Sequence, residues 1–78
     1  MFIPDKDARG VSNIETNITS AATADLCFQN VLEHKKANSA DYVNAATWNP
    51  VLKHCYAETK ATSLVDYQNW QACIFSGI

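Results

Sequence analysis

The sequence predicts a small α+β fold in which one helix packs on antiparallel β-strands. Residues 21–35 are rich in Ala and Leu, which favour helices. Two segments of aromatic and β-branched residues lie on either side of Asn49-Pro50, as two strands lie on either side of a turn. The chain of 78 residues has no Gly/Ser- or Pro-rich linker, so we expect a single domain over 1–78. A domain this short buries only about 60% of its unfolded surface, so a covalent cross-link would matter to its stability.

The N-terminal part of the chain carries no strong periodic pattern. It contains Pro4, Gly10 and a polar stretch from Asn13 to Thr19 that is rich in Asn and Thr. Such residues are typical of turns and irregular segments. We therefore expect residues 1–19 to form a short extended segment and a loop.

A helix is predicted over residues 21–35. Thr19 or Ser20 can cap its N-terminus, because a side-chain oxygen there can accept a hydrogen bond from a free backbone N–H. The far end gathers basic residues, which suit the negative end of a helix dipole. Cys27 and Val31 are four residues apart and so project from one face, which we expect to be buried.

The second half of the chain predicts strands. Residues 42–48 form one strand, Asn49-Pro50 begins a turn, and residues 52–56 form the antiparallel partner. Residues 58–66 have the composition of a loop. Residues 70–75 are predicted as the last strand.

Charge and hydropathy argue against two classes of partner. Six Lys/Arg against eight Asp/Glu give a net charge of −2, and the basic residues are scattered, so we expect no nucleic-acid binding. The apolar runs are too short to span a bilayer, and we expect no membrane insertion. Met1–Asp5 lacks the features of a signal peptide, so the chain is either cytosolic or a domain excised from a longer protein whose signal lies elsewhere.

The cysteines and histidines do not form a metal-binding pattern. Cys27, Cys55 and Cys73 permit one intramolecular disulfide in three possible pairings, and their spacing does not choose among them. No CxxC pair is present, and His34 and His54 do not have zinc-finger spacing, so we expect no metal and no cofactor. The carboxylates are dispersed and no sequence feature points to a base for Cys73, so we expect that the protein is not an enzyme.

The order and content of several segments resemble the PAN/Apple family. In that family one helix packs on a curved antiparallel sheet, and a helix cysteine is bridged to the sheet. The resemblance therefore implies a Cys27–Cys55 disulfide. It covers nearly the whole chain, through residues 7–10 (DARG), 24–29 (ADLCFQ), 44–50 (NAATWNP), 54–57 (HCYA) and 75–78 (FSGI).

One departure from the family concerns its second bridge. The resemblance places the two halves of that bridge at Val31 and Val43, and both are valine here. We interpret the pair as a disulfide replaced by a hydrophobic contact, since two compact apolar side chains can still pack together. Cys73 then has no partner, and we expect a buried free thiol rather than a link to another chain.

The resemblance implies an extracellular recognition or adhesion module that binds glycans or proteins, as one domain among several in a secreted or cell-surface protein. Heparin binding would need a basic cluster, which the sequence lacks. The aromatic and amide residues near the last predicted loop, Tyr67, Asn69 and Trp70, are the candidate ligand-binding residues. Trp48 and Tyr56 are expected to serve core packing instead.

Two further expectations complete the functional interpretation. Asn17-Ile18-Thr19 matches the N-glycosylation pattern, so Asn17 is a candidate glycosylation site in a predicted loop. The alternatives to a recognition module are a structural module that joins chains, through Cys73 or an apolar patch, and a small cytosolic domain with reduced thiols. A count of free thiols distinguishes these alternatives.

Overall fold

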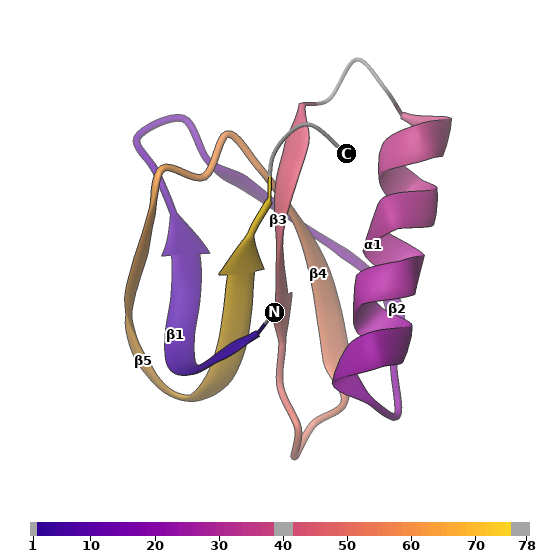
Figure 1. Cartoon of the computed structure of the whole chain (residues 1–78), viewed down its shortest axis with the longest axis vertical. Helices are drawn as coiled ribbons and strands as arrows, with labels where there is room; N and C mark the ends of the chain where they lie inside the picture. The colour runs from indigo at the N-terminus through magenta and orange to yellow at the C-terminus, as the bar shows by residue number, and fades with distance from the viewer. Residues whose placement is uncertain (1, 39–41, 76–78) are drawn as a thin grey trace.

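The computed structural model describes residues 2–38 and 42–75. Its elements are β1 (Ile3–Arg9), β2 (Ile14–Ser20), α1 (Ala24–Ala37), β3 (Val43–Trp48), β4 (His54–Thr59) and β5 (Ser63–Ile74). The strands form one antiparallel sheet in the order β1-β5-β3-β4-β2, and α1 packs against the β3-β4-β2 side (Figure 1). The predicted α+β fold, one helix on an antiparallel sheet, is confirmed.

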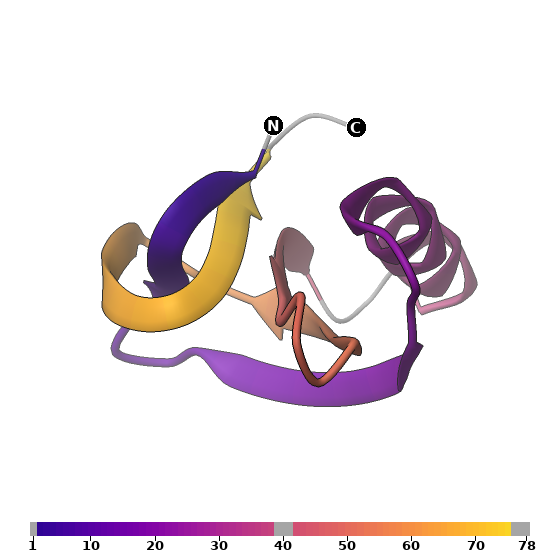
Figure 2. The same ribbon diagram turned by 90° about the horizontal axis from the view of Figure 1, so that it is seen from below.

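The sheet is strongly curved. Seen from below, the β1–β5 pair rises on one side and α1 on the other (Figure 2). The curvature coincides with an irregularity in the β1–β5 pairing, where Pro4 faces Gln71 but Lys6 already faces Asp66. Four residues of β5 therefore bulge out opposite the single residue Asp5, and bulges of this kind bend a strand.

Helix α1 begins later than the sequence predicted. Its N-cap is Thr23, whose side-chain oxygen accepts a 3.2 Å hydrogen bond from the N–H of Leu26. Thr19 and Ser20, the expected caps, belong instead to β2 and pair with β4. Within the described part of the chain, no helix is long and apolar enough to cross a membrane.

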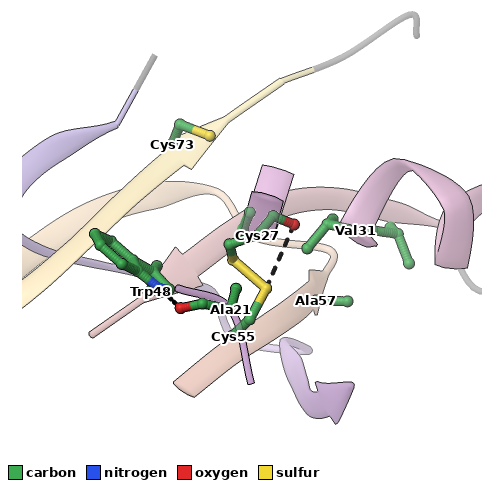
Figure 3. Close-up of a cluster of buried hydrophobic side chains, with 9 residues drawn as sticks. Ala21, Cys27, Val31, Trp48, Cys55, Ala57 and Cys73 are labelled. Atoms are coloured by element: carbon green, nitrogen blue, oxygen red, sulfur yellow. Dashed lines mark hydrogen bonds between the residues drawn. A yellow bond between two sulfur atoms is a disulfide. The ribbon is translucent and has the colours of Figure 1, made fainter. Parts of the chain in front are cut away.

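The predicted buried face of α1 is confirmed. Cys27 and Val31 are fully buried and lie in a cluster that we call the helix-side core. A disulfide joins Cys27 to Cys55 of β4, with their Cα atoms 5.5 Å apart (Figure 3). The helix-side core consists of Ala21, Cys27, Val31, Val43, Ala46, Trp48, Cys55, Ala57 and Cys73.

Trp48 also belongs to this core, as expected. It is buried, and its indole Nε1–H donates a 2.8 Å hydrogen bond to the carbonyl oxygen of Ala21 (Figure 3). A buried indole usually finds such a partner, because an unpaired N–H would cost free energy. The bond ties the end of β3 to the segment that leads into α1.

Three predictions about the strands were wrong. The N-terminal segment contains the strands β1 and β2, and the predicted loop 58–66 contains the end of β4 and the start of β5. Conversely, Leu52 and Lys53 lie in the turn, because the Asn49 Oδ1 atom accepts hydrogen bonds from the N–H groups of Val51 and Leu52 and lengthens it.

Candidate functional site

Side-chain alternation divides the strands between two faces. On β4, Cys55 and Ala57 belong to the helix-side core, so Tyr56 and Glu58 point to the opposite face. On β5, Cys73 belongs to the helix-side core, which places Ala72 and Trp70 on the opposite face as well. This face, without a helix over it, carries an aromatic group and a carboxyl group.

The aromatic group is a stack of three rings, Tyr56, Trp70 and Tyr67, which we call the aromatic stack. The Trp70 ring lies 5.4 Å from the Tyr56 ring and 5.8 Å from the Tyr67 ring, measured between centroids. The planes of Trp70 and Tyr67 differ by only 1°, and those of Trp70 and Tyr56 by 16°. Trp70 is therefore the central ring, and the two tyrosines form the ends.

The two ends of the stack differ in exposure. Tyr67 is 49% exposed, whereas Tyr56 and Trp70 are half-buried. Tyr56 also contacts the ring of His54 at 6.3 Å. The Tyr67 end is thus the more accessible one.

The bulge in β5 positions these rings. Asn69, between Tyr67 and Trp70 in the bulge, has a left-handed backbone with φ 73°, and its N–H donates a 3.0 Å hydrogen bond to Oδ1 of Asp5. Asn tolerates this conformation better than most residues. Asn69 therefore shapes the bend between the two rings and leaves its own side chain exposed.

The structure brings together the three ligand-binding candidates. Tyr67 and Trp70 stack, and Asn69 lies in the bulge between them. Tyr56, which the sequence assigned to the core, lies instead in the stack. The sequence does contain a signal for this position. Tyr56 is adjacent to the bridged Cys55, and neighbouring side chains on a strand point to opposite faces of the sheet.

Asn17, the candidate glycosylation residue, lies on the edge strand β2 rather than in the predicted loop. It is exposed, and it pairs directly with Tyr56 of β4. Asn17 therefore stands next to one end of the aromatic stack.

The second group on this face is a set of three carboxyls, Asp7, Glu15 and Glu58, which we call the carboxyl cluster. An oxygen from each lies within 4.8 Å of the others. Glu58 and Asp7 are 0% and 2% exposed. Sequence reasoning missed this group, because its members come from three different strands and appear dispersed along the chain.

Hydrogen bonds and one cation satisfy these buried carboxyls. The Arg9 Nε lies 2.8 Å from Oδ2 of Asp7, and the Arg9 guanidinium also lies 3.5 Å from Glu15. The Asn13 amide donates a 3.1 Å hydrogen bond to Oε1 of Glu58. Every buried side-chain N or O atom among the described residues has such a partner.

Burial shifts the proton equilibria of the carboxyl cluster. Removal from water and the neighbouring Glu15 together raise the pKa of Glu58 to about 8, against the opposing effect of hydrogen bonds from Asn13 and Thr47. The pKa of Asp7 is also raised by burial and by Glu15, while Arg9 opposes the change. Glu58 therefore holds a proton at neutral pH.

The spacing of the three carboxyls is one that a metal ion could use. In this structure, however, Arg9 supplies the positive charge, and Asn13 and Thr47 occupy the carboxyl oxygens of Glu58. The arrangement is that of a buried polar network that ties β1, β2, β3 and β4 together.

Cys73 is a free, buried thiol, as expected, since Cys27 and Cys55 are joined to each other. Figure 3 shows it on β5, apart from the bridge. Burial raises the pKa of its thiol, which keeps the sulfur protonated and weakly nucleophilic.

Comparison with protein families, curated proteins and solved structures finds no match to this chain. The class that the structure itself defines is a small α+β domain with a helix-to-strand disulfide.

Proposed function

We propose that the chain is an extracellular recognition module of the PAN/Apple type that binds carbohydrate through the aromatic stack. The Cys27–Cys55 disulfide and the curved antiparallel sheet are the features that the sequence resemblance implies, and they support the proposal. Disulfides of this kind persist mainly in oxidising compartments, which favours a secreted or cell-surface location.

The observation that carries the proposal is the exposed ring of Tyr67 held parallel to Trp70. A pyranose ring has an apolar face that packs on the face of an aromatic ring, and a ring that is already fixed loses little entropy on binding. Stacking on Trp70 and the bulge at Asn69 both restrain Tyr67. Such an exposed and restrained ring is a suitable anchor for a sugar.

The polar groups beside the stack suit an uncharged ligand. The side chains of Gln68 and Asn69 are exposed next to Tyr67, and amides exchange hydrogen bonds with sugar hydroxyls. Lys6, on the strand that pairs with β5, is engaged in an ion pair with Asp66. We therefore expect neutral glycans to bind better than sulfated ones.

A glycan array tests the proposal, with the isolated domain as probe. Tyr67→Ala should weaken binding of the best glycan by about 1–3 kcal/mol, the range of a good interface anchor. The matched control is Tyr42→Ala, because Tyr42 is exposed but lies outside the stack. Equal affinity of the folded Tyr67→Ala variant and the parent would overturn the assignment of this surface. Capture of a protein without any glycan signal would assign the domain to protein recognition.

A further inference from the structure

The sequon Asn17-Ile18-Thr19 lies where a sugar would have both space and an aromatic partner. Among the described strands β2 lies at the edge of the sheet and pairs with β4 alone, and Asn17 is exposed. Ile18 packs against the helix-side core, so the neighbouring Asn17 side chain points to the opposite face. That is the face of the aromatic stack.

The strand register places Asn17 directly beside Tyr56. The two residues are paired across β2 and β4, and side chains paired in this way have Cβ atoms about 4.5–5.5 Å apart on one face. Trp70 stacks on Tyr56 and His54 contacts it, so the Tyr56 ring is restrained. The first sugar of a glycan on Asn17 is therefore attached within reach of a fixed aromatic ring.

The strand pairing of β2 is irregular at the sequon. The β2–β4 register shifts between Asn17 and Thr19, which leaves Ile18 without a partner across the strands. Such a bulge bends the edge strand and re-aims its side chains. In a strand without a bulge, Asn17 and Thr19 would both follow the regular pairing with β4.

We infer that Asn17 carries an N-linked glycan whose first N-acetylglucosamine packs on Tyr56 and closes that end of the aromatic stack. The inference rests on the proposed function only in requiring passage through the secretory pathway. Its consequence is a division of labour within the stack. The chain's own glycan covers the Tyr56 end and the open edge of β2, and the Tyr67 end stays free for an external ligand. Covering the edge also blocks strand pairing with a second chain.

The test uses protein secreted from eukaryotic cells and trimmed by an endoglycosidase to a single N-acetylglucosamine. Mass spectrometry of the Asn17 peptide should show occupancy, and NMR should show contacts between the sugar and the Tyr56 ring protons. Against the unglycosylated Asn17→Gln variant, the sugar should raise the folding equilibrium constant about 2- to 10-fold, as expected for one ring-stacking contact.

A double-mutant cycle isolates the contact. In a Tyr56→Leu background, which keeps an apolar side chain in place, the stabilisation by the sugar should disappear. An unoccupied Asn17 in secreted protein would overturn the inference. So would a sugar that stabilises both backgrounds equally, or one without contacts to Tyr56 in the parent. Ligand binding at Tyr67, measured on the Asn17→Gln variant, tests the proposed function separately.

Discussion

The hydroxyl oxygen of Thr47 lies 2.8 Å from Oε2 of Glu58, at the centre of the carboxyl cluster. The same hydroxyl lies 3.2 Å from Oδ1 of Asp7. One hydroxyl carries one hydrogen and cannot donate to two carboxylates at once. A proton on one of the two carboxyls would satisfy both contacts, and burial beside Glu15, which raises the pKa of Glu58, favours Glu58 as the group that holds it.

Glu58 makes the stability of the domain depend on pH. Its pKa is raised from 4.5 to about 8 in the folded state, so between these values the folded chain holds a proton that the unfolded chain releases. The free energy of unfolding should then fall as the pH rises from about 4.5 to about 8, by at most about 5 kcal/mol at 1.4 kcal/mol per pKa unit. The raised pKa of Asp7 acts in the same direction. Urea denaturation at pH 5, 7 and 9 measures the slope.

Glu58→Gln should remove most of that slope. The amide keeps the shape and one acceptor, cannot ionise, and so should make the domain more stable than the parent at pH 9 and similar at pH 5. Glu33→Gln on the exposed face of α1 is the matched control and should leave the slope unchanged. A parent slope that survives in Glu58→Gln would assign the effect to another group.

Reduction of the Cys27–Cys55 bridge should lower the free energy of unfolding. The bridge closes a loop with a sequence separation of 28, for which the chain-entropy model gives about 3.5 kcal/mol. Denaturant titrations with and without reductant measure the difference, and Cys73→Ala should show the same difference. The unreduced, denatured chain should contain one free thiol. A count of three would contradict the bridge, and a count of none would indicate a link between chains.

Val31 and Val43 should accept a second bridge. They are 0% and 1% exposed and lie in the same helix-side core, one on α1 and the other on β3. The double substitution Val31→Cys, Val43→Cys should form a disulfide spontaneously and stabilise the domain by up to about 3 kcal/mol. Thiol counting checks it, because a second bridge leaves one free thiol. Three free thiols would show that the two Cα atoms do not approach within the roughly 7 Å that a bridge needs.

Substitutions at Asn69 should distinguish its effect on the backbone of the β5 bulge from the role of its side chain in binding. Its φ of 73° suits Gly and is strained for Ala, so Asn69→Ala should cost about 1–2 kcal/mol and Asn69→Gly much less. If the amide binds the ligand, Asn69→Gly should weaken glycan binding without loss of stability. Chemical denaturation and glycan titration of both variants measure the two effects. Equal stability of the two variants would contradict the backbone role.

Local signals explain which parts of the fold could be predicted from the sequence. The helix was predictable because its composition and the basic residues at its C-terminal end lie within one short segment. The edge strands were not, because β2 (IETNITS) lacks a regular apolar alternation and is fixed by hydrogen bonds to residues far along the chain, such as Ile14 with Thr59. Thr19 and Ser20 were predicted as helix caps because their strand partners, Cys55 and His54, are distant in the sequence.

The candidate site was predictable only in part. Tyr67, Asn69 and Trp70 are close in sequence, so their proximity needed no knowledge of the fold. The third ring, Tyr56, comes from β4, which β3 separates from β5 in the sheet, so its place in the stack depends on the fold. The carboxyl cluster likewise depends on the fold, which brings β1 near β3 so that Asp7 contacts Thr47.

The antiparallel pairing of Ile3 with Ala72 determines how the domain would respond to a force applied at its two ends. The described ends of the chain leave the fold side by side, from the β1–β5 pair. A force pulling on both ends would therefore open this pair like a zipper, one hydrogen bond after another, rather than shear it. The Cys27–Cys55 bridge lies outside the path of this opening, so α1 and β4 would stay joined while the outer strands yield. The domain would lengthen under load before its covalently closed part is reached.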